Sequence, residues 1–209
     1  MTSVTGTGTD YRLEKIRSLT ELPSYEEVKD AVGRLQADED EKFPSAWWKF
    51  CEDNRIYNAW NIEFVDVLAA EIKKFDVAPV IEICAGNGKL SYHLQRRGIS
   101  IVLTSHSLGH VPGVENMWHF EALVKYNPQL VVGSWIPDSN TLTDTVLYRS
   151  VRYVIDIGHP ELCALTEDVT KRPDIEITPM PSVQRYSICK SDRIGVKYNS
   201  QVNLVRRRA

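Results

Sequence analysis

Val80-Ile81-Glu82-Ile83-Cys84-Ala85-Gly86-Asn87-Gly88-Lys89-Leu90 is the stretch on which the fold of this chain depends. It begins with a short run rich in β-branched apolar residues, as in a strand that is buried in a parallel sheet. Gly86 and Gly88 then let the chain turn without a Cβ in the way, and they let backbone N–H groups approach a ligand closely. Residues 89–97 continue as a helix, and residues 99–103 read as a second apolar strand. The stretch therefore predicts a strand, a glycine loop, a helix and a strand, which is the first half of an α/β sheet.

Glycine loops of this kind hold phosphate or nucleotide groups, and their residue patterns separate the ligand classes. A phosphate-binding P-loop needs Gly-x-x-x-x-Gly-Lys-Ser/Thr, but Ile83 stands in place of the first glycine and Leu90 in place of the hydroxyl residue. A dinucleotide-binding loop needs Gly-x-Gly-x-x-Gly, and Ser91 stands in place of the third glycine. The P-loop is therefore excluded, and the dinucleotide pattern fits only in part.

A third pattern, acidic-x-x-x-Gly-x-Gly, is complete between Glu82 and Gly88. It resembles motif I of the class I S-adenosylmethionine-dependent methyltransferases. The resemblance implies that the backbone of Ala85, Gly86, Asn87 and Gly88 holds the methionine part of S-adenosylmethionine (SAM). It also implies that Glu82 organises the ammonium end of this cofactor. A tight strand-to-helix turn without a ligand is the alternative interpretation of the same residues.

Length, charge and cysteine usage limit the class of protein. The 209 residues suffice for one domain with a full core. A net charge of −3 gives no indication of a nucleic-acid partner, and the basic residues 206–208 are typical of a solvated end. The chain has no apolar run of about 18 residues that would cross a membrane, and residues 1–9 do not resemble a signal peptide. The four cysteines lack Cys-x-x-Cys spacing, so we expect reduced thiols in an intracellular, cytoplasmic protein, and no metal site.

The first part of the chain is predicted to be helical. Residues 1 to about 10 are expected to form a disordered lead-in. Ser24-x-x-Glu27 is a capping-box pattern that predicts a helix over residues 25–37. Apolar residues at helical spacing predict another helix over residues 57–75.

Aromatic residues are frequent in these helices. Trp47 and Trp48 are adjacent, and adjacent residues cannot share one helix face, so at least one should lie near a surface or a pocket. In the family that the chain resembles, helices before motif I often form a lid over cofactor and substrate. The resemblance makes Tyr57, Trp60 and Asn61 candidates for that lid.

The remaining elements complete a sheet. Strands are predicted over residues 114–117, 130–137 and 151–158, and residues 183–190 and 200–206 alternate as two further strands. This order resembles the plan of class I methyltransferases. It implies an α/β fold, namely a three-layer α/β/α sandwich with N-terminal helices. The sheet should be seven-stranded and mostly parallel, with one antiparallel C-terminal strand.

The same resemblance divides the chain into two parts. Residues 1–56 would form the disordered lead and the lid or cap helices. Residues 57–209 would form the Rossmann-like methyltransferase domain.

The end of the second strand departs from the family pattern. The family usually has an Asp or Glu there that binds the ribose hydroxyls, whereas this chain has Ser105 and His106. Either side chain could hydrogen-bond a hydroxyl, so both are candidate cofactor residues. Met117 or Trp118 would flank the adenine ring or pack in the core.

The loop over residues 133–138 follows the fourth strand, where the methyl acceptor often lies in this family. It loosely resembles the Asp/Asn/Ser-Pro-Pro-aromatic loop of amine methyltransferases, with the aromatic residue before the proline. Ser134 and Trp135 are therefore candidate binding residues, Trp135 offering a π face to a cationic centre, and Asp138 is a candidate catalytic residue. A surface turn built on Pro137 and Asp138 is the alternative.

The fifth strand carries Asp156, an unusual residue for a central strand, and leads to His159. His159 is the best candidate for a general base, because histidine ordinarily titrates near neutral pH, but a structural histidine is the interpretation that the pattern favours. The predicted function is SAM-dependent methyl transfer to a small-molecule acceptor. A methyltransferase-like binding module without catalysis, motivated by the missing carboxylate, and an NAD(P)-dependent oxidoreductase, motivated by Gly-x-Gly, are the alternatives.

Overall fold

The computed structural model describes residues 10–37, 45–106, 112–163, 165, 167–195 and 198–208. The expected lead-in lies almost wholly outside these residues. The helices are α1 (Tyr11–Arg17), α2 (Tyr25–Ala37), α3 (Ala46–Asp53), α4 (Ile62–Lys73), α5 (Lys89–Gln95), α6 (His119–Tyr126), α7 (Ser139–Leu147), α8 (Glu167–Thr170) and α9 (Pro181–Gln184). The strands are β1 (Val80–Ile83), β2 (Ile101–Ser105), β3 (Glu115–Asn116), β4 (Leu130–Ser134), β5 (Tyr153–Gly158), β6 (Ile175–Pro179) and β7 (Gln201–Arg207).

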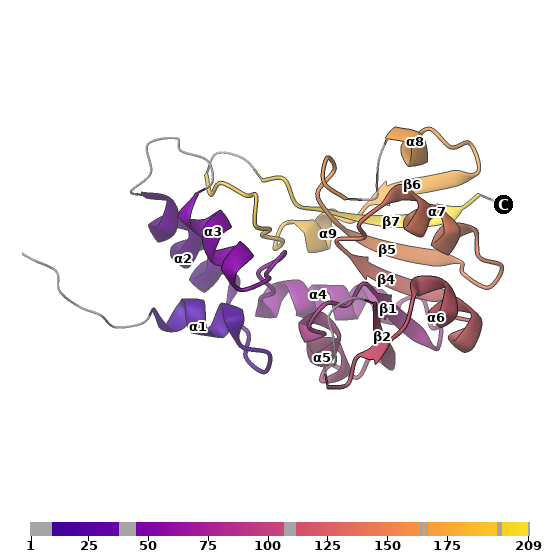
Figure 1. Ribbon diagram of the computed structural model, residues 1–209, viewed down its shortest axis with the longest axis horizontal. Coiled ribbons are helices and arrows are strands. Elements are labelled where there is room, and N and C mark those ends of the chain that lie inside the picture. The colour runs from indigo at the N-terminus through magenta and orange to yellow at the C-terminus, as the bar shows by residue number, and fades with distance from the viewer. Residues whose placement is uncertain are drawn as a thin grey trace, which may run out of the picture.

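The strands form one seven-stranded sheet in the order β3-β2-β1-β4-β5-β7-β6. The pairs among β3, β2, β1, β4 and β5 are parallel, while β7 runs antiparallel to both β5 and β6. Helices cover both faces of the sheet (Figure 1). The predicted fold, a mostly parallel seven-stranded sheet with one antiparallel C-terminal strand, is confirmed.

Adjacent residues of β5 show how the two faces are filled. Ile155 packs with Leu68 of α4 in one core cluster, while Val154 packs with Leu142 of α7 in the other. Successive side chains of a strand point to opposite faces, so an apolar run such as Val154-Ile155 serves both layers. The central strands are therefore buried on both sides, as their composition predicted.

The prediction of a strand over residues 183–190 is wrong. Helix α9 covers the start of this stretch, and the strand beside β7 is β6, earlier in the chain. The later part runs beside the residues before α4: Ala59 N–H donates to Ile188 O at 2.9 Å, and Lys190 N–H donates to Tyr57 O at 2.9 Å. The alternation of apolar and polar residues thus reflects packing on the N-terminal helices rather than pairing in the sheet.

The helix predicted over residues 57–75 begins later, at Ile62. Asn61 is its N-cap, and the Asn61 side chain accepts from Phe64 N–H at 2.9 Å. The capping box before α2 is confirmed: Ser24 N–H donates to Glu27 Oε2 at 2.6 Å, and Glu27 N–H donates to Ser24 Oγ at 3.2 Å. Reciprocal caps of this kind satisfy backbone donors that the first turn leaves free.

Helices α1, α2 and α3 gather at one end of the molecule, opposite the C-terminus (Figure 1). They enclose a small core in which Trp47 is fully buried, and Trp47 Nε1 donates to Cys189 O at 3.1 Å. Trp48 is only partly buried, so the prediction that one of the two tryptophans lies near a surface is confirmed. Because Ile188 belongs to the same core, the division of the chain at residue 56 stays a prediction. No helix in the described ranges has both the length and the apolar character needed to span a membrane.

Candidate functional site

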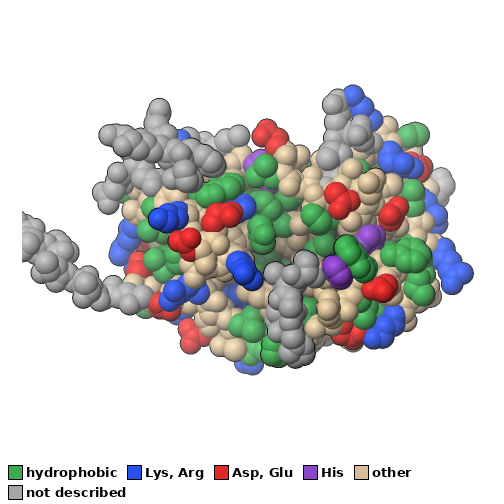
Figure 2. Space-filling model, in the orientation of Figure 1, with side chains coloured by type: hydrophobic (Ala, Val, Ile, Leu, Met, Phe, Trp, Pro, Cys, Tyr) green, Lys and Arg blue, Asp and Glu red, His purple; other side chains and the backbone are tan. Residues whose placement is uncertain are grey.

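A cavity of about 450 Å³ opens at the carboxyl ends of β1, β2 and β4. Its walls come from the residues that follow these strands, and Ile16 of α1 and residues 55–57 of the N-terminal part close another side. Hydrophobic side chains gather near the centre of the face between the N-terminal helices and the sheet (Figure 2). In open α/β sheets, ligands bind at this edge, and the volume is typical of a small-molecule site.

The glycine loop forms the floor of the cavity. Three residues of the turn have positive φ angles, namely Cys84 (56°), Gly86 (56°) and Gly88 (75°). Ala85, Gly86 and Asn87 line the cavity, whereas Gly88 is buried and does not. Asn87 Oδ1 accepts from the backbone N–H of the first residue of α5 at 3.1 Å, an Asx turn that leads into the helix, whose N-cap is Gly88.

Glu82 lies below the loop and is almost fully buried. Its carboxylate accepts a hydrogen bond from Ser91 Oγ, and Thr104 Oγ1 donates to Glu82 O at 2.9 Å. Burial raises the pKa of Glu82 to about 7, although the hydrogen bond from Ser91 opposes the shift. Ser91, which stands in place of the third glycine, therefore donates a hydrogen bond to the acidic residue of the motif.

This buried carboxyl group predicts a pH dependence of stability that Glu82→Gln removes. A pKa raised in the folded state favours folding below the ordinary value of 4.5, and the benefit is lost as pH rises through about 7. The free energy of unfolding of the wild type, relative to Glu82→Gln, should therefore fall by up to about 3 kcal/mol between pH 4.5 and 8. Urea unfolding of both proteins across this range measures the difference. Parallel pH profiles of the two proteins would contradict the assignment.

Lys89 is a site residue that sequence reasoning missed. Its side chain is buried, and its Nζ donates to Lys15 O at 2.8 Å and to Ile16 O at 3.0 Å, both at the C-terminal end of α1. Burial lowers the pKa of Lys89 to about 8. The first residue of α5 thus holds α1 against the glycine loop, where Ile16 reaches the cavity.

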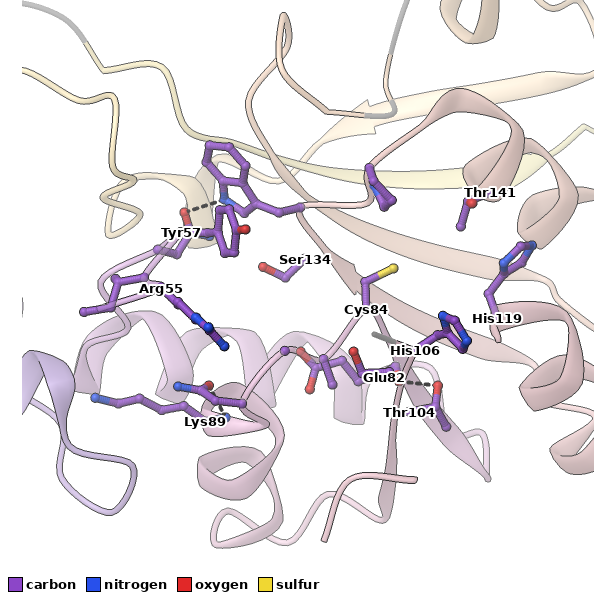
Figure 3. Close-up of a pocket in the computed structure, with 18 of the residues that line it drawn as sticks. Arg55, Tyr57, Glu82, Cys84, Lys89, Thr104, His106, His119, Ser134 and Thr141 are labelled. Carbon is purple, nitrogen blue, oxygen red and sulfur yellow. Dashed lines mark hydrogen bonds between the residues drawn. The ribbon is translucent and has the colours of Figure 1, made fainter. Parts of the chain in front are cut away.

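At the end of β2, Ser105 and His106 both line the cavity, and their role as cofactor residues stays a prediction. Ser105 is buried, and the exposed His106 ring stacks on Trp118 with 3.6 Å between centroids and 19° between planes. Met117 and Trp118 also line the cavity. The positions expected near the ribose and the adenine therefore share one wall, with His106 on the right of the close-up (Figure 3).

The loop after β4 brings Ser134, Trp135 and Asp138 to the cavity. Trp135 has a φ of 56°, its N–H donates to Ile157 O at 2.7 Å, and its Nε1 donates to Asn58 Oδ1 at 3.1 Å. Asp138 caps α7: its carboxylate accepts from Thr141 N–H at 2.8 Å and from Thr141 Oγ1 at 3.0 Å. The loop therefore places a fixed indole and a capping carboxylate at the edge where a ligand would sit.

The order of the sheet, its reversed last strand and the glycine loop after β1 together decide the fold. The fold is that of the class I methyltransferases. No family model and no curated protein matches the chain.

Several solved structures similar to this chain are methyltransferases, and the three described below share low sequence identity with it. The 23S rRNA methyltransferase ErmE is 19% identical, with 69% of this chain and 68% of that chain covered and a TM-score of 0.41. Magnesium protoporphyrin IX methyltransferase from Synechocystis PCC 6803, with bound SAM, is 14% identical, with 90% and 99% covered and a TM-score of 0.46. The plantazolicin methyltransferase BpumL, in complex with SAH, is 11% identical, with 95% and 100% covered and a TM-score of 0.43. These likenesses concern the fold alone.

The methyltransferase fold does not bring His159 to the cavity. The imidazole Nδ1 accepts from Glu161 N–H at 3.0 Å, and the ring centroid lies 6.5 Å from that of Trp135. The chain turns sharply after β5, with Cys163 Sγ accepting from His159 N–H at 3.2 Å, and this turn fixes the histidine. The assignment of His159 as a general base stays a prediction that the geometry does not support. Asp156 of β5 is buried as well, and burial raises the pKa of Asp156 to about 7.

The N-terminal side of the cavity contains two of the three lid candidates. Tyr57 and Trp60 line the cavity, while Asn61 instead caps α4 and donates to Tyr186 O at 2.8 Å. Arg55, which sequence reasoning missed, extends toward the centre of the cavity between Tyr57 and Lys89 (Figure 3). Within the described ranges, Arg55 forms no ion pair, and no three His, Cys, Asp or Glu side chains are grouped as metal ligands.

Proposed function

We propose that the protein is a SAM-dependent methyltransferase that acts on a small-molecule acceptor. The observation that carries the proposal is the position of the glycine loop, which presents Ala85, Gly86 and Asn87 to a cavity at the carboxyl end of β1. Gly86, at a φ of 56°, lets the backbone approach a ligand without strain. The N-terminus of α5 follows directly, and its free N–H groups favour a carboxylate nearby.

Charged groups on the cavity wall fit the two ends of the amino-acid part of SAM. Glu82 lies at the floor, where it would face an ammonium group. Arg55 would pair with the carboxylate, because Lys89 already donates to the carbonyls of α1. Ser105 and His106 would hydrogen-bond the ribose hydroxyls in place of the usual carboxylate.

When bound, SAM supplies a sulfonium methyl group that is already activated for in-line transfer. The chain then has mainly to position the acceptor and to exclude water, and Trp135 and the N-terminal residues around Tyr57 are placed to do so. An acceptor that must lose a proton needs a base within reach. Asp138 lies on the cavity wall and is the remaining candidate for it.

Calorimetric titration with S-adenosylhomocysteine (SAH), 5′-methylthioadenosine, NAD and NADP tests this proposal. The wild type should bind SAH and should not bind either dinucleotide. Arg55→Met should raise the Kd for SAH at least about tenfold, because a charge-assisted contact to the carboxylate is lost. The Kd for 5′-methylthioadenosine, which has no carboxylate, should stay unchanged in the same variant.

Arg149→Met, which removes an exposed arginine away from the cavity, is the control and should bind SAH like the wild type. Equal losses for SAH and 5′-methylthioadenosine in Arg55→Met would refute the carboxylate contact. Binding of NADP in place of SAH would favour the oxidoreductase. Binding of SAH without methyl transfer to any acceptor would favour a binding module that has lost catalysis, an alternative motivated by Ser105 and His106 at the end of β2.

A further inference from the structure

The ammonium group of Lys190 is surrounded by three aromatic rings. Lys190 Nζ lies 4.5 Å from the ring centroid of Trp48, 4.8 Å from that of Tyr57 and 5.3 Å from that of Trp135. Glu52 Oε1 accepts from the same Nζ at 2.6 Å. We call these three rings the aromatic cage. Rings that present their faces to one cation, with a carboxylate beside them, are the arrangement by which proteins recognise ammonium ligands.

The cage is assembled from three separate parts of the chain. Trp48 comes from α3, Tyr57 from the segment before α4, and Trp135 from the loop after β4. The rings of Tyr57 and Trp135 are 5.2 Å apart, and the indole of Trp135 is held by its hydrogen bond to Asn58. A backbone φ of 56° at Trp135 is uncommon for such a residue and persists only where the surroundings impose it. The surrounding structure thus holds Trp135, one wall of the cage, in a strained backbone conformation.

The cage and the cavity share walls. Tyr57 and Trp135 line both, and Trp135 follows Ser134 directly at the carboxyl end of β4. Figure 3 shows Tyr57 and Ser134 on neighbouring sides of the cavity. A group in the cage therefore sits at the edge of the space in which a small acceptor would lie.

The backbone of Lys190 is held in place independently of its side chain. Its backbone N–H donates to Tyr57 O at 2.9 Å, so the main chain stays in place when the flexible side chain leaves. A lysine that served only as a brace would need the Glu52 carboxylate and no aromatic walls. The faces of three aromatic rings attract a cation, and they therefore give the site the selectivity for a cation that a ligand site requires.

We propose that the aromatic cage binds an ammonium group of the methyl acceptor, primary to quaternary, and that Lys190 is its built-in competitor. The identification of this ligand as the methyl acceptor rests on the proposed function, but binding of an ammonium group in the cage can be tested without methyl transfer. The ligand displaces the Lys190 side chain and takes its place among Trp48, Tyr57 and Trp135. The acceptor is thus predicted to be a cationic amine or a choline-like compound.

Calorimetric titration at constant ionic strength with choline and with its uncharged isostere 3,3-dimethyl-1-butanol tests the cage. Lys190→Met empties the cage of charge and should bind choline at least about tenfold more tightly than the wild type does. The isostere should bind this variant at least about tenfold more weakly than choline. Lys190→Arg keeps a cation in the cage and should show no gain.

A second substitution locates the binding. Trp48→Leu in the Lys190→Met background should cancel the gain, and Trp48 is not part of the cavity wall, so the loss cannot come from damage to the cavity. Lys190→Gln provides a second vacant cage and should behave like Lys190→Met. No gain for choline in either variant, equal binding of the isostere, or unfolding of both variants would identify Lys190 as a structural brace and overturn the inference.

SAH titrated into the same samples separates the two proposals. Binding of SAH without binding of choline would overturn the cage and leave the methyltransferase proposal standing. Binding of choline without binding of SAH would support the cage and reject the methyltransferase proposal.

Discussion

Gly88→Ala is expected to weaken binding of SAH at least about tenfold while the protein still folds. Gly88 has a φ of 75°, which costs an L-residue roughly 1–2 kcal/mol. A Cβ on Gly88 would lie 2.7 Å from Leu103 Cδ2 and 3.0 Å from Val114 Cγ2, so these side-chain ends must turn aside or the loop must move. Because Gly86 and Asn87 lie on the cavity side of the same turn, relief of the backbone strain at Gly88 shifts the segment that meets the ligand.

Gly98→Ala is a matched control for this variant. Gly98 follows the other end of the α5 region, has a φ of 79°, and would place its Cβ in open space. Both variants should lose about 1–2 kcal/mol of unfolding free energy to backbone strain, but only Gly88→Ala should lose affinity for SAH. Urea unfolding and calorimetric titration measure the two effects. Equal affinities in the two variants would exclude the glycine loop as the cofactor seat.

Trp47→Ala is expected to destabilise the protein by about 3–5 kcal/mol. The side chain is fully buried among α1, α2 and α3, stacks on Phe50 with 5.8 Å between centroids, and donates to Cys189 O. Its removal leaves a large void and an unsatisfied carbonyl, which adds to the lost hydrophobic burial.

The neighbouring Trp48→Ala removes the same chemical group from a partly exposed site. It should cost less, about 1–3 kcal/mol, since the Trp48 side chain is only partly buried and its removal leaves a smaller void, together with the loss of the cation–π contact with Lys190. Denaturant unfolding of both variants tests this contrast. Similar losses for Trp47→Ala and Trp48→Ala would contradict the greater burial of Trp47.

The sequence predicted those parts of the fold whose signal is local. The capping box of Ser24 and Glu27 gave the start of α2, because both partners of the cap lie within one turn. The β-branched run before Gly86 placed β1 and the loop, because few residue types suit a buried parallel strand and a positive φ. The adjacency of Trp47 and Trp48 was enough to predict that one of them lies near a surface.

Features that depend on distant contacts were missed. The alternation after Val183 wrongly predicted a strand, since α9 and a turn occupy most of this stretch and only an isolated bridge joins Cys189 to Asn58. Arg55 and Lys89 carry no local pattern that marks them as site residues. Arg55 reaches the cavity only because the segment before α4 passes over it, and Lys89 is buried only because α1 docks on the loop.

Lys89 also couples two events that are separate in the sequence. It opens the helix after the glycine loop, and its ammonium group closes the end of α1. Binding of a ligand at the glycine loop and docking of α1 therefore both depend on the position of Lys89. By reciprocity, any free energy with which docking of α1 favours such a molecule is returned in full as tighter docking. The docking of α1 on Lys89 therefore reports whether the glycine loop is occupied.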